Sequence, residues 1–288
     1  MEPQLGTDYL LNLYPYIRRF YHWFRRTQKG EIKRWGRSAP SKEAYRWRGR
    51  TLNHTLTSGL DDYPRGVPHP GELHLDLLCW MGYTAKTLKM MAVRLGEEDD
   101  ADEYEQEYQN IVANIDALHW NEEEKIYCDL TVNHEDESEF VCHRGYITLF
   151  PLLLGLLPPD SEHLDHLLDL ISDKKHLWTS YGLRSLSKKD PYYGQGENYW
   201  RGPIWMNMNY LALSSLHKNY ATVEGPYQEK ANKIYQQLRK NIVTNLYKQY
   251  TKTGFFWEQY SQVNGKGRRA HPFSGWSALV VLMMAEKY

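Results

Sequence analysis

The sequence predicts an all-α protein built from helical hairpins. Apolar residues recur at helical spacing along most of the 288 residues, and short turns alternate with long loops rich in Trp, Tyr and Gly. When hairpins pack side by side in a ring, every second connection lies at the same end, so this alternation favours an (α/α)6 toroid. About eight or nine helices are visible, fewer than six hairpins require. We therefore expect a ring that is incomplete at its N-terminal side.

The first third of the chain predicts two helices separated by a loop. Large apolar residues at helical spacing indicate a helix over residues 8–24, with basic residues near its C-terminal end, where they complement the helix dipole. Residues 30–58 show no sustained period and predict a long loop, which in a compact domain is typically functional. A second helix follows Pro70 and is closed by Gly96.

The middle of the chain predicts a third helix, a hairpin and two further helices. The third helix begins near Asp102, and a short β-like run within residues 120–142 indicates a hairpin. Residues 145–157 are apolar on all sides, which predicts a buried helix kinked at Pro151. Ser161 is placed to cap the N-terminus of the helix after it.

A second long aromatic loop, residues 174–201, leads into the last part of the chain. It predicts a helix over residues 203–220 with proline at the first helical position, followed by a partner helix that begins at Pro226. A loop over residues 247–273 and a final apolar helix over residues 275–288 complete the prediction.

Composition limits the class of protein. A hydrophobic content of 41% suits one large domain or two small ones, and we predict a single domain over residues 1–288. The net charge of −1 predicts no nucleic-acid partner, and no run approaches the roughly 18 apolar residues of a membrane span, so no membrane contact is predicted for this chain. The three cysteines lack metal-ligand spacing, and no cofactor is predicted. Cys128 and Cys142 are expected either to form a disulfide or to remain free thiols.

The aromatic residues are predominantly those that carry a polar group. The chain has 10 Trp and 23 Tyr but only 7 Phe. Sugar-binding sites use such rings because the apolar face of a sugar stacks on them while its hydroxyls need hydrogen-bonding neighbours. A large core with additional surface tyrosines would explain the same composition.

Three turns at predicted helix entrances each combine a carboxylate with aromatic residues and glycine: SGLDDYPR, GENYWRGPIW and FWEQY. Glycosidic bond cleavage needs a protonated acid beside the leaving oxygen and a second carboxylate that attacks or activates water. Asp61 and Glu258 are the natural pair, and Asp62 competes with Asp61 for the first role. Taken singly, such carboxylates are more often solvated or cap a helix.

Further residues near these turns are candidates for contact with a hydroxyl-rich ligand. Glu72 and Asp76 lie four apart at a helix start and share one face, although acids in a first helical turn are also favourable without any ligand. The arginines in these turns are alternatively structural ion-pair partners. The predicted substrate-binding residues are Trp47, Arg48, Asp62, Tyr63, Arg65, Glu72, Asp76, Trp200, Arg201, Trp257 and Trp276.

Five blocks of the sequence, in order, resemble the C-terminal catalytic domain of the mannosyl-oligosaccharide glucosidases, the processing α-glucosidases I of glycoside hydrolase family 63. They are SGLDDYPR, GELHLDLLCW, YGLRSLS, GENYWRGPIWMNMNY and FWEQYSQVNGKGRRAHPFSGWSALV. The resemblance implies an (α/α)6 toroid, with Asp61 as general acid, Glu258 as general base, and Glu72 and Asp76 near the bound glucose. It implies hydrolysis with inversion, which needs a carboxyl separation of roughly 6.5–9.5 Å.

The implied partner is an N-linked oligosaccharide on nascent glycoproteins. The family removes the terminal α-1,2-linked glucose of the triglucosylated precursor in the lumen of the endoplasmic reticulum. Its members are longer, with a membrane span and an N-terminal β-sandwich, so we expect this chain to be a fragment. Two alternatives stay open: another inverting toroid hydrolase of the trehalase or glucoamylase type, and an inactive glycan-binding fragment.

Overall fold

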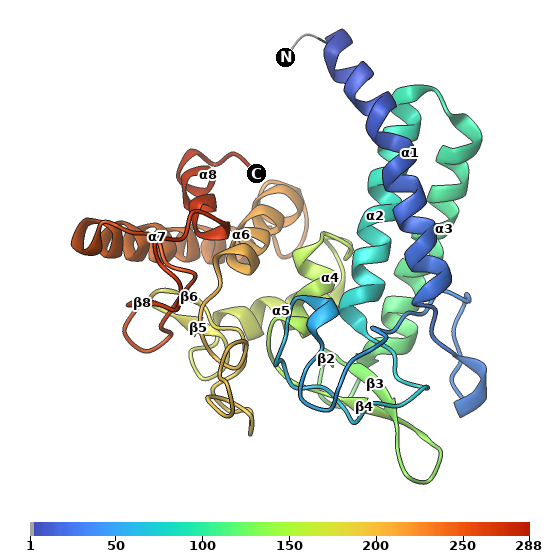
Figure 1. Cartoon of the computed structure of the whole chain (residues 1–288), viewed down its shortest axis with the longest axis horizontal. Helices are drawn as coiled ribbons and strands as arrows, with labels where there is room; N and C mark the ends of the chain where they lie inside the picture. The colour runs from blue at the N-terminus through green and yellow to red at the C-terminus, as the bar shows by residue number, and fades with distance from the viewer. Residues whose placement is uncertain (1–2) are drawn as a thin grey trace. The chain divides into compact units, whose positions relative to one another are not determined.

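The computed structural model describes residues 3–288 and contains two compact units (Figure 1). Unit 1 comprises Met1–Leu52, Gly66–Asn121 and Tyr127–Val141, and unit 2 comprises Asn53–Arg65, Glu122–Ile126 and Cys142–Tyr288. The chain therefore passes between the units several times. Each unit is described separately below.

Unit 1 is organised around three long helices, α1 (Pro3–Thr27), α2 (Leu75–Leu95) and α3 (Glu98–His119). Both α1 and α3 pack on α2 (Figure 1). The three predicted helices of this region are confirmed, and Gly96 ends α2 in the left-handed conformation (φ 77°) that glycine adopts without strain. The first helix is longer than its hydrophobic stripe predicted, because polar residues continue it at both ends.

The segment between α1 and α2 is the predicted long loop. Within unit 1 it contains only a short 3₁₀ turn, η1 (Lys33–Trp35), and a β-bridge between Lys29 and Tyr45 joins two parts of the loop. The predicted hairpin also forms, as antiparallel strands β3 (Asp129–Val132) and β4 (Ser138–Val141). Two-residue strands β1 (Trp120–Asn121) and β2 (Ile126–Tyr127) precede it.

Unit 2 contains the remaining α-helices of the described chain, in which α7 packs against α5, α8 and a π-helical turn (Figure 1). Short strands β5 and β6 pair in one hairpin, and β7 and β8 pair in another. The 3₁₀ turns are η2 (Leu56–Ser58), η3 (Ile147–Leu149) and η5 (Trp276–Leu279). The other bounds are α4 (Phe150–Leu153), α5 (Glu162–Ser172), β5 (Trp178–Thr179), β6 (Gly182–Leu183), α6 (Met206–Ser215), π-helix η4 (Leu216–Ala221), α7 (Gln228–Thr253), β7 (Gln259–Tyr260), β8 (Gly267–Arg268) and α8 (Val280–Ala285).

The prediction of one kinked helix over residues 145–157 is wrong in form, although the segment is buried as expected. Its helical part is limited to η3 followed directly by α4. The start of the segment is not helical because the Tyr146 N–H donates to the Ser185 carbonyl oxygen at 2.9 Å, as in a β-ladder. A pairing distant in sequence therefore overrides the local apolar pattern.

Two other predicted boundaries are wrong for physical reasons. The helix expected from residue 203 begins later, at Met206, because Ile204 is extended and exchanges backbone hydrogen bonds with Tyr260 at 2.8 and 2.9 Å. The loop expected from residue 247 begins only after Gly254 (φ 76°), since α7 continues with Tyr247 and Tyr250 exposed on its surface. The aromatic residues there resembled a loop but lie on a helix.

The cysteines resolve the alternatives that the sequence left open. Cys128 and Cys142 are disulfide-bonded, whereas Cys79 is a buried free thiol. In residues 3–288, no helix is both long and apolar enough to cross a membrane.

A buried polar network in unit 2 fixes the entrance of α6. Asn209 has no exposed surface; its Oδ1 accepts the Leu183 N–H at 2.7 Å, and its Nδ2 donates to the Tyr146 hydroxyl at 3.1 Å. The Trp205 N–H donates to the same hydroxyl at 3.2 Å. Because buried polar groups are costly to leave unpaired, this network holds the chain just before α6 in one position.

Candidate active site

Asp62 anchors one site loop of unit 2 to another. The side chain is 2% exposed, and its two carboxylate oxygens accept the backbone N–H groups of Tyr199 at 3.0 Å and Trp200 at 2.6 Å. The Arg201 Nε donates to the Asp62 carbonyl oxygen at 2.6 Å. The predicted binding residues Asp62 and Arg201 therefore join the SGLDDYPR and GENYWRG segments to each other.

Asp61 lies beside this anchor but is only half-buried. Burial is the main cause that raises the pKa of its carboxyl, and the neighbouring charge of Asp62 is the second. Both causes disfavour the ionised form. The two adjacent acids therefore differ. The Asp62 carboxylate accepts two backbone N–H groups, whereas the pKa of the Asp61 carboxyl is raised.

Glu258 is held as a hydrogen-bond acceptor at the start of the β7–β8 hairpin. Its carboxylate accepts the Tyr199 hydroxyl and, at 3.0 Å, the Ala270 N–H. Its backbone is fixed as well, because the Glu258 N–H donates to Ala270 O at 3.0 Å and the Trp276 Nε1 donates to Glu258 O at 2.6 Å. The side chain and the backbone of Glu258 are therefore both held in one position.

Tyr199 connects Glu258 electrostatically to Asp61. Burial raises the pKa of the Tyr199 phenol, and the hydrogen bond to Glu258 and the charges of Glu258 and Asp61 raise it further. Asp61 therefore lies within electrostatic reach of the hydroxyl that binds Glu258. The Arg269 guanidinium lies over the Tyr199 ring, 5.2 Å from its centroid, and donates to the Glu197 carbonyl oxygen at 2.8 Å.

Aromatic rings surround these carboxylates in unit 2. Trp200 stacks on Trp205 with ring centroids 3.8 Å apart, and Trp257 stacks on His271 at the same distance. Trp276 lies next to Trp205 at 5.6 Å. The predicted residues Trp200, Trp257 and Trp276 thus belong to the same unit as the two catalytic candidates, and Trp257 and Trp276 are half-exposed.

The two remaining predicted residues of unit 2 are buried. The Tyr63 hydroxyl donates to His143 O at 3.2 Å, and the ring packs where Gly145 has no side chain; a Cβ there would lie 2.0 Å from the hydroxyl. Arg65 is 9% exposed. The Tyr63 contacts hold the SGLDDYPR turn in place.

The other predicted binding residues form a separate cluster at the start of α2 in unit 1. The Trp47 Nε1 donates to Asp76 Oδ1 at 3.0 Å, and Asp76 has no exposed surface. Glu72 is ion-paired with Arg50 at 2.9 Å. Arg48 is exposed and donates to Lys29 O at 3.1 Å. These four predicted residues share unit 1, and the structure brings Trp47 and Asp76 into direct contact.

Two residues of the unit 2 site, Tyr199 and Arg269, were not predicted from the sequence. Tyr199 directly precedes the predicted Trp200 and Arg201, and Arg269 lies in the same block as Glu258. Their position in these blocks was a usable signal. Their contacts were not predictable, since Tyr199 and Glu258 meet only in the folded chain.

Replacing Tyr199 by Phe tests its role as a positioning residue. We expect kcat/KM to fall about tenfold, because the phenylalanine ring cannot donate a hydrogen bond to the Glu258 carboxylate. Tyr247→Phe, on the exposed surface of α7, is the matched control and should leave kcat/KM unchanged. Lower thermal stability with unchanged kcat/KM in Tyr199→Phe would instead indicate a purely structural role.

Sequence comparison identifies related proteins along the whole chain. A profile described as the glycosyl hydrolase family 63 C-terminal domain matches residues 1–286. The chain is 50% identical to a probable mannosyl-oligosaccharide glucosidase of Schizosaccharomyces pombe, over 100% of this chain and 36% of the relative. It is 41% identical to the mannosyl-oligosaccharide glucosidase of Saccharomyces cerevisiae, over 97% of this chain and 35% of that protein. The chain thus spans about a third of the length of these relatives.

The fold resembles that of a solved enzyme. The family 63 mannosylglycerate hydrolase from Thermus thermophilus, in complex with glucose, superposes with a TM-score of 0.57 over 76% of this chain and 49% of that one, at 20% sequence identity. The predicted all-α fold class is confirmed: the chain is of the helical toroid type, with only short strands in its described residues.

Proposed function

Since this chain belongs to glycosyl hydrolase family 63, we propose that it carries the catalytic residues of an inverting exo-α-glucosidase. Its proposed substrate is the triglucosylated N-glycan precursor, from which it removes the terminal α-1,2-linked glucose. Two observations support this choice: the relatives are named mannosyl-oligosaccharide glucosidases, and the Thermus hydrolase binds glucose. The proposed location is the lumen of the endoplasmic reticulum, where that precursor is processed.

The observation that carries the proposal is the different environment of two carboxyl groups in unit 2. Asp61 has a raised pKa and would give its proton to the leaving glycosidic oxygen. Glu258, held by Tyr199 and Ala270, would take a proton from the attacking water. Inverting hydrolysis of a glycoside requires one carboxyl group in each of these two roles.

Aromatic residues of unit 2 would hold the glucose. The partly exposed rings of Trp257 and Trp276 would contact the sugar, while the Asp62 anchor keeps the turn of Asp61 against the 199–201 segment. For Glu72 and Asp76 of unit 1 no direct sugar contact is proposed, because both side chains are buried and already paired with Arg50 and Trp47.

The substrate proposal is tested with three disaccharides of glucose. We expect the 288-residue chain to release glucose from the α-1,2-linked disaccharide but not from trehalose or maltose. Proton NMR of the first product should show the β-anomer, because inversion converts an α-linkage into β-glucose. Turnover of trehalose or maltose would instead favour another toroid hydrolase, and glycan binding without turnover would favour an inactive fragment.

A further inference from the structure

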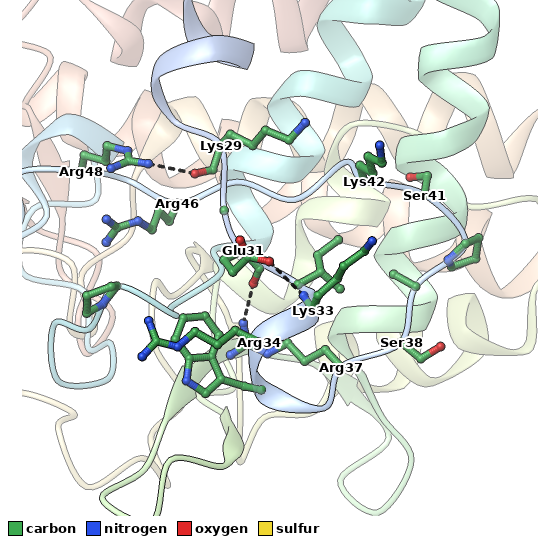
Figure 2. Close-up of a pocket in the computed structure, with 16 residues that line it drawn as sticks. Lys29, Glu31, Lys33, Arg34, Arg37, Ser38, Ser41, Lys42, Arg46 and Arg48 are labelled. Carbon is green, nitrogen blue, oxygen red and sulfur yellow. Dashed lines mark hydrogen bonds between the residues drawn. The ribbon is translucent and has the colours of Figure 1, made fainter.

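A cavity of unit 1 lies under the loop that joins α1 to α2 (Figure 2). Its volume is about 850 Å³, and all of its lining residues belong to unit 1. This is within the size range of small-molecule sites, roughly 300–1,000 Å³. None of the proposed catalytic residues lines it, and Arg48 is the one predicted substrate-binding residue that does.

The lining is strongly basic. Seven of its residues are Lys or Arg, and the single acid is Glu31. Glu31 Oε1 is already used, since it accepts the Lys33 N–H at 3.0 Å. Figure 2 shows the long basic side chains extending from the loop around Glu31. One carboxylate cannot balance seven cations in a concave site, where field lines converge.

The arginines of the cavity are held mainly by neutral oxygens. Arg37 donates to Glu31 O at 3.1 Å, to Thr131 O at 2.9 Å and to the Ser138 hydroxyl at 2.8 Å. Arg46 is ion-paired with Glu72, but at the long distance of 3.8 Å. These contacts fix the guanidinium groups in space while leaving most of their charge uncompensated.

Electrostatics agree with this geometry. Burial lowers the pKa of Arg37 to about 10, and burial together with the charge of Arg48 lowers the pKa of Arg46. Positive groups that are buried and repel one another are stabilised when an anion binds among them. The fold has therefore placed cations where they are unfavourable without an anionic ligand.

One wall of the cavity is the buried indole of Trp35. The guanidinium groups of Arg34 and Arg37 lie 5.3 and 5.4 Å from its ring centroid. Cation–π contact orients both groups, and the Trp35 Nε1 is fixed by Asp136 at 2.9 Å. The cavity is therefore built on a rigid ring rather than on free surface side chains.

From this arrangement we infer that the cavity binds a compact phosphate ester, in which the phosphate is recognised by Arg34, Arg37 and the neighbouring lysines. Guanidinium groups match the geometry of phosphate oxygens in pairs. The concave shape and small volume favour a compact ligand over an extended acidic peptide. The neutral glycan of the proposed function would leave these cations uncompensated, so the inference is independent of that function.

Calorimetric titration with inorganic phosphate and with glucose 6-phosphate tests the inference on the full chain. Arg34→Gln is the informative variant, because Arg34 is exposed and its guanidinium lies on the Trp35 ring. We expect binding about three- to tenfold weaker in this variant, and weaker still as ionic strength rises. Lys33→Gln, also exposed, provides a second variant that should fold normally.

Arg94→Gln is the matched control. Arg94 is exposed in the last turn of α2, about 30 Å along the helix from Leu75. The start of α2 is the cavity end, because the His74 N–H donates to Tyr45 O and Tyr45 bridges Lys29. The control removes the same charge outside the cavity and should leave phosphate affinity unchanged.

The outcomes separate the sources of the ligand. Binding of both phosphate probes that is weakened by Arg34→Gln and not by Arg94→Gln supports a soluble phosphate ester. Binding only to phosphatidylcholine vesicles that contain phosphatidylinositol 4-phosphate, with the same response to the variants, assigns the phosphate to a lipid headgroup. Absence of binding at millimolar phosphate, equal weakening in the control, or binding of polyglutamate alone would overturn the inference.

Discussion

Replacing Glu258 by Gln is expected to lower kcat for the α-1,2-linked disaccharide about 10²–10⁴-fold, because the amide cannot take a proton from water. The amide oxygen can still accept the Ala270 N–H, and the amide NH2 can donate to the Tyr199 hydroxyl oxygen, so folding and KM should change little. Glucose release and thermal unfolding measured on the same preparation check both parts. Glu224→Gln, an exposed acid of unit 2, is the control and should be fully active.

The matching change at Asp61 separates the acid from the base. Asp61→Asn should slow the disaccharide as strongly but slow α-glucosyl fluoride much less, since fluoride leaves without a proton from a carboxylic acid. In the unchanged chain, activity should fall as pH rises through the pKa of Asp61, because the acid form is lost. Burial and Asp62 raise that pKa, so the alkaline limb should lie above the range of an exposed aspartic acid.

Three results would contradict these roles. The first is full activity of Glu258→Gln. The second is equal loss of fluoride and disaccharide hydrolysis in Asp61→Asn. The third is a pH profile with its alkaline limb at the value of an unperturbed aspartic acid, near pH 4. The first would move the base role to a different residue, and the other two would move the acid role to a different residue.

The spacing of apolar residues predicted the helices of unit 1 well, because the apolar face of each helix packs against a neighbouring helix. α2 and α3 pack on each other along their length, so the apolar spacing survives in the sequence. In unit 2 the errors occur where backbone pairs with distant backbone. Ile204 and Tyr146 each form backbone hydrogen bonds with remote residues, and no local pattern carries that information.

The residues of the candidate site could be predicted from the sequence, but the contacts between them could not. The turns containing Asp61 and Glu258 could be recognised from carboxylates beside aromatic residues. The sequence could not show which of the two adjacent acids is anchored. The groups that decide this are the backbone N–H groups of Tyr199 and Trp200, more than a hundred residues away. The basic cavity shows the same limit: its loop was expected to be functional, but its chemistry required the folded positions of Arg34 and Arg37.

Replacing Asp62 by Ala should give the largest loss of stability among the site substitutions. Two backbone N–H groups would lose a charged acceptor in a buried position, and hydrogen bonds to charged groups contribute about 1.5–3 kcal/mol each. We therefore expect unfolding to be easier by about 2–5 kcal/mol. Chemical denaturation measures this loss, and Asp160→Ala, at an exposed aspartate of unit 2, should cost little.

Asp62→Asn separates anchoring from electrostatics. The amide keeps the shape and one acceptor oxygen, so we expect about half the loss of the alanine variant. Because the charge that helps to raise the pKa of Asp61 is removed, the alkaline limb of activity should move to lower pH. A variant that loses stability with no movement of this limb would show that Asp62 acts on Asp61 only through position. Movement of the limb with unchanged stability would show that the 199–200 backbone is held without this carboxylate.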